Sequence, residues 1–267
     1  MSTIATDKNK RGKLVAIALM ITSIVVLSKL IQQSDVVNIY GVFLNGFLIG
    51  ILSYFSLLWA LNFQITLRSL TYVLSQSALV VFVLTVFLEI FVFRRVGRVY
   101  EIIILLSVSG IMFFITYASY LMANIFNVAQ FKEIPLVQVA KTTSMLLTLL
   151  SIYFITFSVL EISVRGDVTI ILLALVYFFI FLFHFRHLGI QRSRFWKSFF
   201  VVFIYTLLIS STFLLIGGNS LVFSIIPSVV AYSLINLTTQ ENISRAQKIE
   251  YYLITLVSIS LIIFTAP

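Results

Sequence analysis

Long runs of apolar residues, separated by short polar segments, dominate the chain. A helix needs about 20 mainly apolar residues to cross the hydrocarbon core of a bilayer, and only a helix satisfies its backbone hydrogen bonds internally. The runs of this kind are Leu14–Ile31, Tyr40–Leu61, Leu70–Phe93, Ile102–Ile125, Thr143–Val164, Val168–Phe183, Phe199–Ile216, Leu221–Leu237 and Tyr251–Ala266. The pattern predicts an all-α fold, a polytopic integral membrane bundle of about nine transmembrane helices.

The first apolar run follows a basic segment and resembles the core of a signal peptide only superficially. It is longer than such a core, and residues 29–33, Lys-Leu-Ile-Gln-Gln, offer no small-x-small cleavage site. We therefore expect a retained first helix after a basic tail at residues 1–13. The connections between later runs are too short for a soluble domain, so residues 14–267 are expected to form a single transmembrane domain.

Lys and Arg residues are distributed unevenly between alternate connections. Thirteen fall on the side of the N-terminal tail and five on the other side, out of 18 in the chain. Cytoplasmic loops are enriched in positive residues, so this count predicts a cytoplasmic N-terminus.

One basic cluster contradicts this orientation. Arg94, Arg95 and Arg98 lie on the predicted outer side. Either a neighbouring segment does not cross the membrane, or the cluster pairs with Glu89 and Glu101 or with outer-leaflet phosphates. Both explanations stay open at this point.

The composition supports a membrane protein. Hydrophobic residues make up 61% of the chain and charged residues 10%, whereas soluble domains carry about 25% charged residues. The net charge of +9 does not indicate nucleic-acid binding, because the basic residues lie between apolar runs, where contacts with the bilayer and its anionic lipid headgroups account for them. The absence of cysteine excludes disulfides and thiolate metal sites.

Ionisable residues inside a bilayer are costly and are therefore candidate functional residues. Glu89 lies about one turn before the end of its run, where it can snorkel to the surface or pair with Arg94 and Arg95. Glu161 stands four residues before Arg165, the order that favours an intrahelical ion pair. These residues are retained as candidates.

His184 and His187 are three residues apart and share one helical face, a spacing that suits metal ligation. A metal site needs further ligands, which this chain lacks nearby. With Arg186 and the basic residues up to Lys197, the two histidines are better interpreted as part of a basic, headgroup-facing segment.

Two further sequence patterns indicate close helix packing and an interrupted helix. Gly46 and Gly50 form a G-x-x-x-G pattern, which lets a second helix approach closely. Pro227 lies inside an apolar run and is expected to interrupt its helix; interrupted helices line substrate sites in transporters.

No catalytic, nucleotide-binding, metal or cofactor motif occurs in the chain, so no cofactor is predicted and an enzymatic function is not supported. The best-supported hypothesis is a permease-like bundle that accommodates a solute or lipid without ion-coupling charges. The alternatives are a non-catalytic membrane subunit that binds partner helices or its own copies, and a membrane-embedded enzyme acting on lipid-linked substrates. A bacterial-type plasma membrane is the expected location.

Overall fold

The computed structural model describes residues 2–31, 39–63, 65, 69–95, 98–129, 135–162, 166–188, 192–216, 220–239 and 244–265. Nearly all of these residues are helical, and none of them is in a strand. A π-helical turn, η1 (Ser69–Val73), precedes the third α-helix. The α-helices are α1 (Ser2–Ile31), α2 (Ile39–Ala60), α3 (Leu74–Arg95), α4 (Arg98–Ala129), α5 (Val137–Ile162), α6 (Gly166–Leu188), α7 (Arg192–Ile216), α8 (Ser220–Phe223), α9 (Ile225–Thr239) and α10 (Arg245–Thr265). The all-α class predicted from the apolar runs is confirmed.

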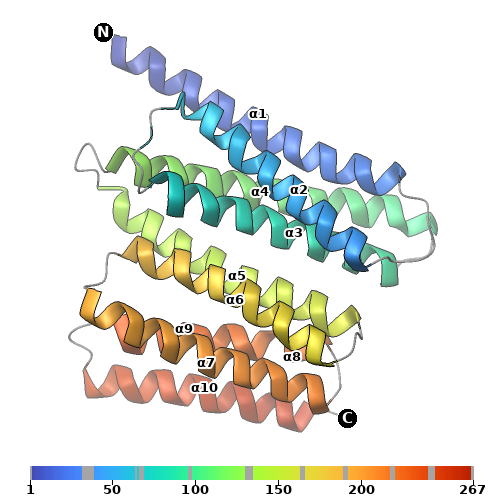
Figure 1. Cartoon of the computed structure of the whole chain (residues 1–267), viewed down its shortest axis with the longest axis vertical. Helices are drawn as coiled ribbons and strands as arrows, with labels where there is room; N and C mark the ends of the chain where they lie inside the picture. The colour runs from blue at the N-terminus through green and yellow to red at the C-terminus, as the bar shows by residue number, and fades with distance from the viewer. Residues whose placement is uncertain are drawn as a thin grey trace. The chain divides into compact units, whose positions relative to one another are not determined.

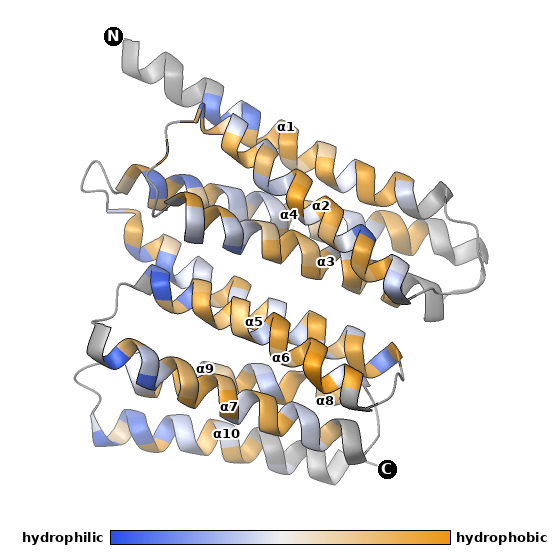
Figure 2. Ribbon diagram, in the orientation of Figure 1, coloured by the Kyte–Doolittle hydropathy of each residue, from blue (hydrophilic) through white to orange (hydrophobic). Residues whose placement is uncertain are grey.

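Eight stretches of the described residues are long and apolar enough to cross a membrane. They are Lys10–Ser28, Tyr40–Ala60, Leu70–Phe91, Ile103–Ala129, Val137–Ile162, Val168–His187, Arg194–Phe213 and Ser220–Thr239. Figure 2 shows apolar residues along most of the helices that could span a membrane, with many of the strongly hydrophilic residues near helix ends. The chain is thus a multi-pass membrane protein. The ninth predicted span, Tyr251–Ala266, begins on α10 and ends outside the described residues, and the cytoplasmic N-terminus stays a prediction.

Contacts divide the chain into two compact units, Met1–Leu147 (unit 1) and Thr148–Pro267 (unit 2). The helix α5 contributes to both units (Figure 1). The single transmembrane domain expected from the sequence stays a prediction, and each unit is described by itself below.

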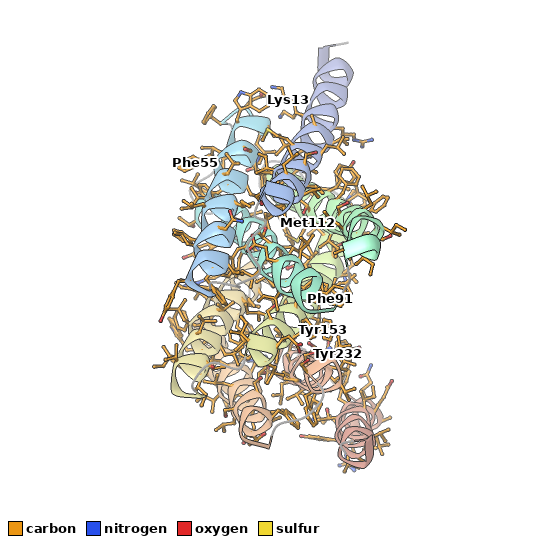
Figure 3. The ribbon with its side chains drawn as sticks, turned by 90° about the vertical axis from the view of Figure 1, so that its right-hand side faces the viewer. Lys13, Phe55, Phe91, Met112, Tyr153 and Tyr232 are labelled. Atoms are coloured by element: carbon orange, nitrogen blue, oxygen red, sulfur yellow. The ribbon has the colours of Figure 1, made fainter. Side chains whose placement is uncertain are left out.

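Unit 1 is built around a ring of four helices. The helix α1 packs against α2 and α4, and α3 packs against α2 and α4, so that α2 and α4 lie opposite each other. Figure 3 shows these four helices around the buried Met112, while Phe55 on α2 points away from the interior. This up-and-down arrangement is the usual one for consecutive helices joined by short connections.

Unit 2 contains a second ring. The helix α7 packs against α6 and α9. The helix α5 is joined to α6 by a bond between Thr156 and Tyr177, and to α9 by the Ser228 hydroxyl, which donates to the Leu149 carbonyl at 3.2 Å. The helix α10 packs on α9. An apolar cluster that includes Phe213 fills the space between α7 and the α8–α9 segment.

One helix end is fixed by unusual backbone geometry. The helix α2 ends at Ala60 and is followed by Asn62 and Phe63, whose φ angles of 54° and 56° lie in the left-handed region. The Phe63 amide donates to the Leu58 carbonyl at 3.2 Å, which satisfies a carbonyl of the last turn. Lys13 joins this end to α1: its ammonium donates to Asn62 Oδ1 at 2.8 Å and lies 4.8 Å from the Trp59 ring centroid (Figure 3).

Candidate functional site

Neutral hydroxyl groups from three helices meet inside unit 2. The Tyr177 hydroxyl on α6 is bonded to Thr156 on α5 and, at 2.9 Å, to Ser210 on α7. All three residues are fully buried. Thr206, one turn before Ser210 on the same face of α7, is also fully buried, and its hydroxyl has no hydrogen-bond partner among the described residues. We call these four residues the Tyr177 cluster.

A second hydroxyl cluster lies inside unit 1. The Tyr120 hydroxyl on α4 and the Ser53 hydroxyl on α2 are 2.6 Å apart, a bond that crosses the ring between opposite helices. Thr116 and Ser119 share the inward face of α4 with Tyr120, since residues three and four positions apart are neighbours on a helix. Ser77 on α3 donates to the Ser119 carbonyl at 3.1 Å. All five residues are fully buried, and we call them the Tyr120 cluster.

Sequence reasoning missed both clusters as candidate sites. Single Ser, Thr and Tyr residues are common in membrane helices, and none carries a recognisable motif. The available signal was the i, i+3, i+4 spacing of Thr116, Ser119 and Tyr120, which places three polar residues on one face. The partner residue Ser53 is 67 positions from Tyr120 and could not be inferred.

The glycines of the G-x-x-x-G pattern lie where α2 contacts α3. A Cβ atom added at Gly46 would be 2.8 Å from a methyl group of Val86. One added at Gly50 would be 3.2 Å from the Ala78 carbonyl oxygen and 3.3 Å from Cβ of Phe82. The missing side chains therefore permit a close approach between two helices of the same chain.

Glu89 belongs to this α2–α3 contact. Its carboxylate accepts a hydrogen bond from the Asn45 amide of α2, and only 1% of the residue is exposed. Because Glu89 is buried, its side chain does not snorkel to the surface, which was one of the two interpretations of the sequence. The side chains of Arg94, Arg95 and Arg98 lie outside the described part of the structure, so their pairing with Glu89 stays a prediction.

Glu161 is hydrogen-bonded to a residue of another helix. Its carboxylate accepts a hydrogen bond from the Ser220 hydroxyl at the start of α8. Arg165, its expected ion-pair partner, is outside the described residues.

The helix that contains Pro227 is interrupted, as expected: α8 ends at Phe223 and α9 begins at Ile225. The intervening Ser224 is fully buried and donates its hydroxyl to the Leu221 carbonyl at 3.0 Å. The Phe223 ring stacks on Phe213 of α7 with centroids 4.9 Å apart. The interruption is therefore packed against apolar side chains, which favours a structural role for Pro227.

The expected headgroup-facing position is wrong for His184. This residue is fully buried, and its Nδ1 lies 3.1 Å from the Thr148 hydroxyl of α5. His187 is partly buried, whereas the Arg186 guanidinium lies 4.6 Å from the Phe195 ring centroid. Within the described residues, no group of three or more His, Asp or Glu side chains is arranged to hold a metal ion.

The geometry defines a class of protein: a multi-pass α-helical membrane protein whose deeply buried polar groups are mostly neutral hydroxyls and amides. No protein-family model, curated protein or solved structure matches the chain. The argument for a function therefore rests on the side chains of this chain.

Proposed function

We propose that the protein is a permease-like bundle that accommodates an uncharged or lipidic solute among its helices, without ion coupling. The observation that carries this proposal is the Tyr177 cluster, in which hydroxyls from α5, α6 and α7 meet with complete burial. Hydroxyl groups both donate and accept hydrogen bonds, so they can exchange partners with a neutral solute. A charged solute would need compensating charges, because burying an unpaired ion is far more costly.

The positions of the described charges also favour an uncharged solute. Among the described side chains, Glu89 is the only buried charged residue, and it lies near the end of the candidate span Leu70–Phe91. Proton- or sodium-coupled carriers place ionisable groups along their transport path. The buried neutral hydroxyls of unit 2 fit passive movement of a neutral compound better.

The environment of the protein is part of the proposal. Short connections between the spans fit a bacterial-type plasma membrane. Arg194 and Lys197 are exposed at the start of α7, beside the half-exposed Trp196. Basic residues next to an interfacial aromatic are suited to contact anionic lipid headgroups.

The other hypotheses receive less support from the geometry. The G-x-x-x-G face assigned to a partner helix is occupied by α3 of the same chain, which weakens the scaffold hypothesis. The enzyme hypothesis depends on His184 being open at a membrane face, yet this residue is buried beside Thr148.

Solute uptake into vesicles tests the proposal. The purified chain is reconstituted into liposomes, and the uptake of small neutral solutes is compared with uptake into protein-free liposomes. We expect faster uptake of at least one neutral solute, reduced by Tyr177→Phe but not by Tyr205→Phe. Tyr205 is a matched control because it is on α7 and 56% exposed. Uptake that equals the protein-free value for every solute would contradict the proposal.

A further inference from the structure

Basic side chains gather at one end of unit 2, where α6 ends and α7 begins. The candidate span Val168–His187 ends one residue after Arg186, and the next candidate span begins at Arg194. Arg186, Arg194 and Lys197 are all exposed. Residues at the ends of spans lie at the level of the lipid headgroups, so three positive charges are placed where headgroups can contact them.

The start of α10 lies at the same end of unit 2. The Thr238 carbonyl, near the end of α9, accepts a hydrogen bond from the Ser198 hydroxyl of α7 at 3.2 Å. The start of α7 is therefore beside the end of α9, and only residues 240–244 separate α9 from α10. Arg245 and Lys248, in the first turn of α10, are exposed, and Figure 2 shows strongly hydrophilic residues there. The chain thus adds two further positive charges at this end.

Aromatic rings hold part of this surface in place. The Arg186 guanidinium lies 4.6 Å from the ring centroid of Phe195, which is buried and stacks on Phe199 with an interplanar angle of 7°. Trp196 is 43% exposed and stacks on Phe200 with centroids 5.8 Å apart. A guanidinium over an aromatic ring is attracted to it and still presents N–H donors to phosphate oxygens. A cation that is already positioned loses less freedom when a ligand binds.

The balance of charge favours an anionic ligand at this end. Glu250, close to Lys248, is the one acidic residue with an exposed side chain in the described part of unit 2. A zwitterionic headgroup brings its own positive charge, which the basic residues repel, whereas an anionic headgroup does not. We call the exposed basic residues the basic end; they are Arg186, Arg194, Lys197, Arg245 and Lys248.

We propose that the basic end binds the headgroup phosphate of an anionic phospholipid in the adjacent leaflet. Two observations favour a lipid over a soluble phosphate: the basic residues flank the ends of candidate spans, and the half-exposed Trp196 lies among them. At this depth the headgroups supply the phosphate groups. The inference goes beyond the proposed function, because a lipid site does not depend on whether a solute is transported.

Tryptophan fluorescence can report which lipid lies at the basic end. The chain has two tryptophans, so Trp59→Phe leaves Trp196 as the single reporter. The full chain with this substitution is reconstituted into vesicles of phosphatidylcholine and phosphatidylglycerol, in which either one lipid or the other is brominated. Quenching of Trp196 by each brominated lipid gives the relative affinity of the surface around this residue for the two headgroups.

Three double variants of this reporter chain complete the test. Arg194→Gln with Lys197→Gln removes two charges from the basic end, whereas Arg194→Lys with Lys197→Arg keeps both. Lys10→Gln with Arg11→Gln is the matched control, because it removes the same charge at the start of the candidate span Lys10–Ser28 in unit 1. Quenching by brominated phosphatidylcholine in vesicles of that lipid alone checks that Trp196 stays at the membrane in each variant.

We expect the reporter chain to prefer phosphatidylglycerol by about fivefold, the effect of roughly one basic residue at a membrane surface. The preference should be lost when Arg194 and Lys197 are replaced by glutamine. It should persist in the charge-conserving variant and in the control, and it should weaken as the salt concentration rises.

Three results would overturn the inference. The first is equal quenching by the two lipids in the reporter chain. The second is a preference that survives Arg194→Gln with Lys197→Gln. The third is a preference abolished by inorganic phosphate but not by sodium chloride at equal ionic strength, which would mean that the basic end binds soluble phosphate. None of these measurements involves solute uptake, so this inference and the proposed function can fail independently.

Discussion

Alanine at Gly46 or Gly50 would force a methyl group into the contact between α2 and α3. At Gly46 the new Cβ would meet a methyl group of Val86 at 2.8 Å, closer than van der Waals contact allows. Valine in a helix has one strongly preferred rotamer, so this methyl group cannot simply turn away. At Gly50 the nearest atom is the Ala78 carbonyl oxygen at 3.2 Å, a backbone atom that moves only with its helix.

The expected magnitude follows from two opposing effects. An additional methyl group in a packed interior costs about 1–3 kcal/mol through strain. Replacing glycine by alanine inside a helix contributes about 0.5–1 kcal/mol in the other direction, because alanine loses less backbone entropy on folding. Gly110 isolates the second effect, since a Cβ there has no neighbour within 4 Å. Gly46→Ala should therefore be about 1–3 kcal/mol less stable than Gly110→Ala, and Gly50→Ala should lie near the lower limit.

The stability of each variant can be measured by titrating sodium dodecyl sulfate into protein in a mild detergent while tryptophan fluorescence is recorded. The midpoints should follow the order Gly110→Ala, wild type, Gly50→Ala and Gly46→Ala, from most to least stable. If Gly46→Ala and Gly50→Ala are as stable as Gly110→Ala, the close approach of α2 and α3 is refuted.

Three further predictions address other contacts. Tyr177→Phe removes the hydroxyl that links three helices and should lower the free energy of unfolding by about 1–2 kcal/mol in the same titration, whereas Tyr205→Phe should not change it. Asn45→Ala leaves the buried Glu89 carboxylate without this donor and should cost about 1–3 kcal/mol, while Glu89→Gln should cost less because its amide oxygen still accepts from Asn45. Gly97→Cys, in a chain without other cysteines, should react with an impermeant thiol reagent only from outside the cell, and labelling from the cytoplasm would reverse the predicted orientation.

The sequence predicts well those features that depend on residues close together in the chain. Apolar length alone locates the spans, since hydrocarbon permits only helices there. Proline lacks an amide hydrogen, and the helix is interrupted three residues before Pro227. The glycines at positions 46 and 50 are spaced for close packing, and a helix lies close against them.

Features that depend on how a helix is rotated and on which helices contact each other could not be predicted as well. His184 was assigned to the headgroups because basic residues follow it, yet its helix turns it toward Thr148. The hydrogen bond that Glu89 accepts from Asn45 of the preceding helix could not be inferred, because the two residues are 44 positions apart in the sequence. Both residues lie near the ends of spans. At such positions a side chain can contact either residues close in the sequence or residues of an adjacent helix. The sequence indicates depth in the membrane better than the direction of a side chain.

The central claim is that a neutral solute moves among these helices without ion coupling. The most direct measurement is the uptake of small neutral solutes into proteoliposomes with and without imposed proton and sodium gradients, each of which an ionophore can collapse. The account predicts uptake faster than in protein-free vesicles and equal rates whether the gradients are present or collapsed. Uptake that stops when either gradient is collapsed would contradict it.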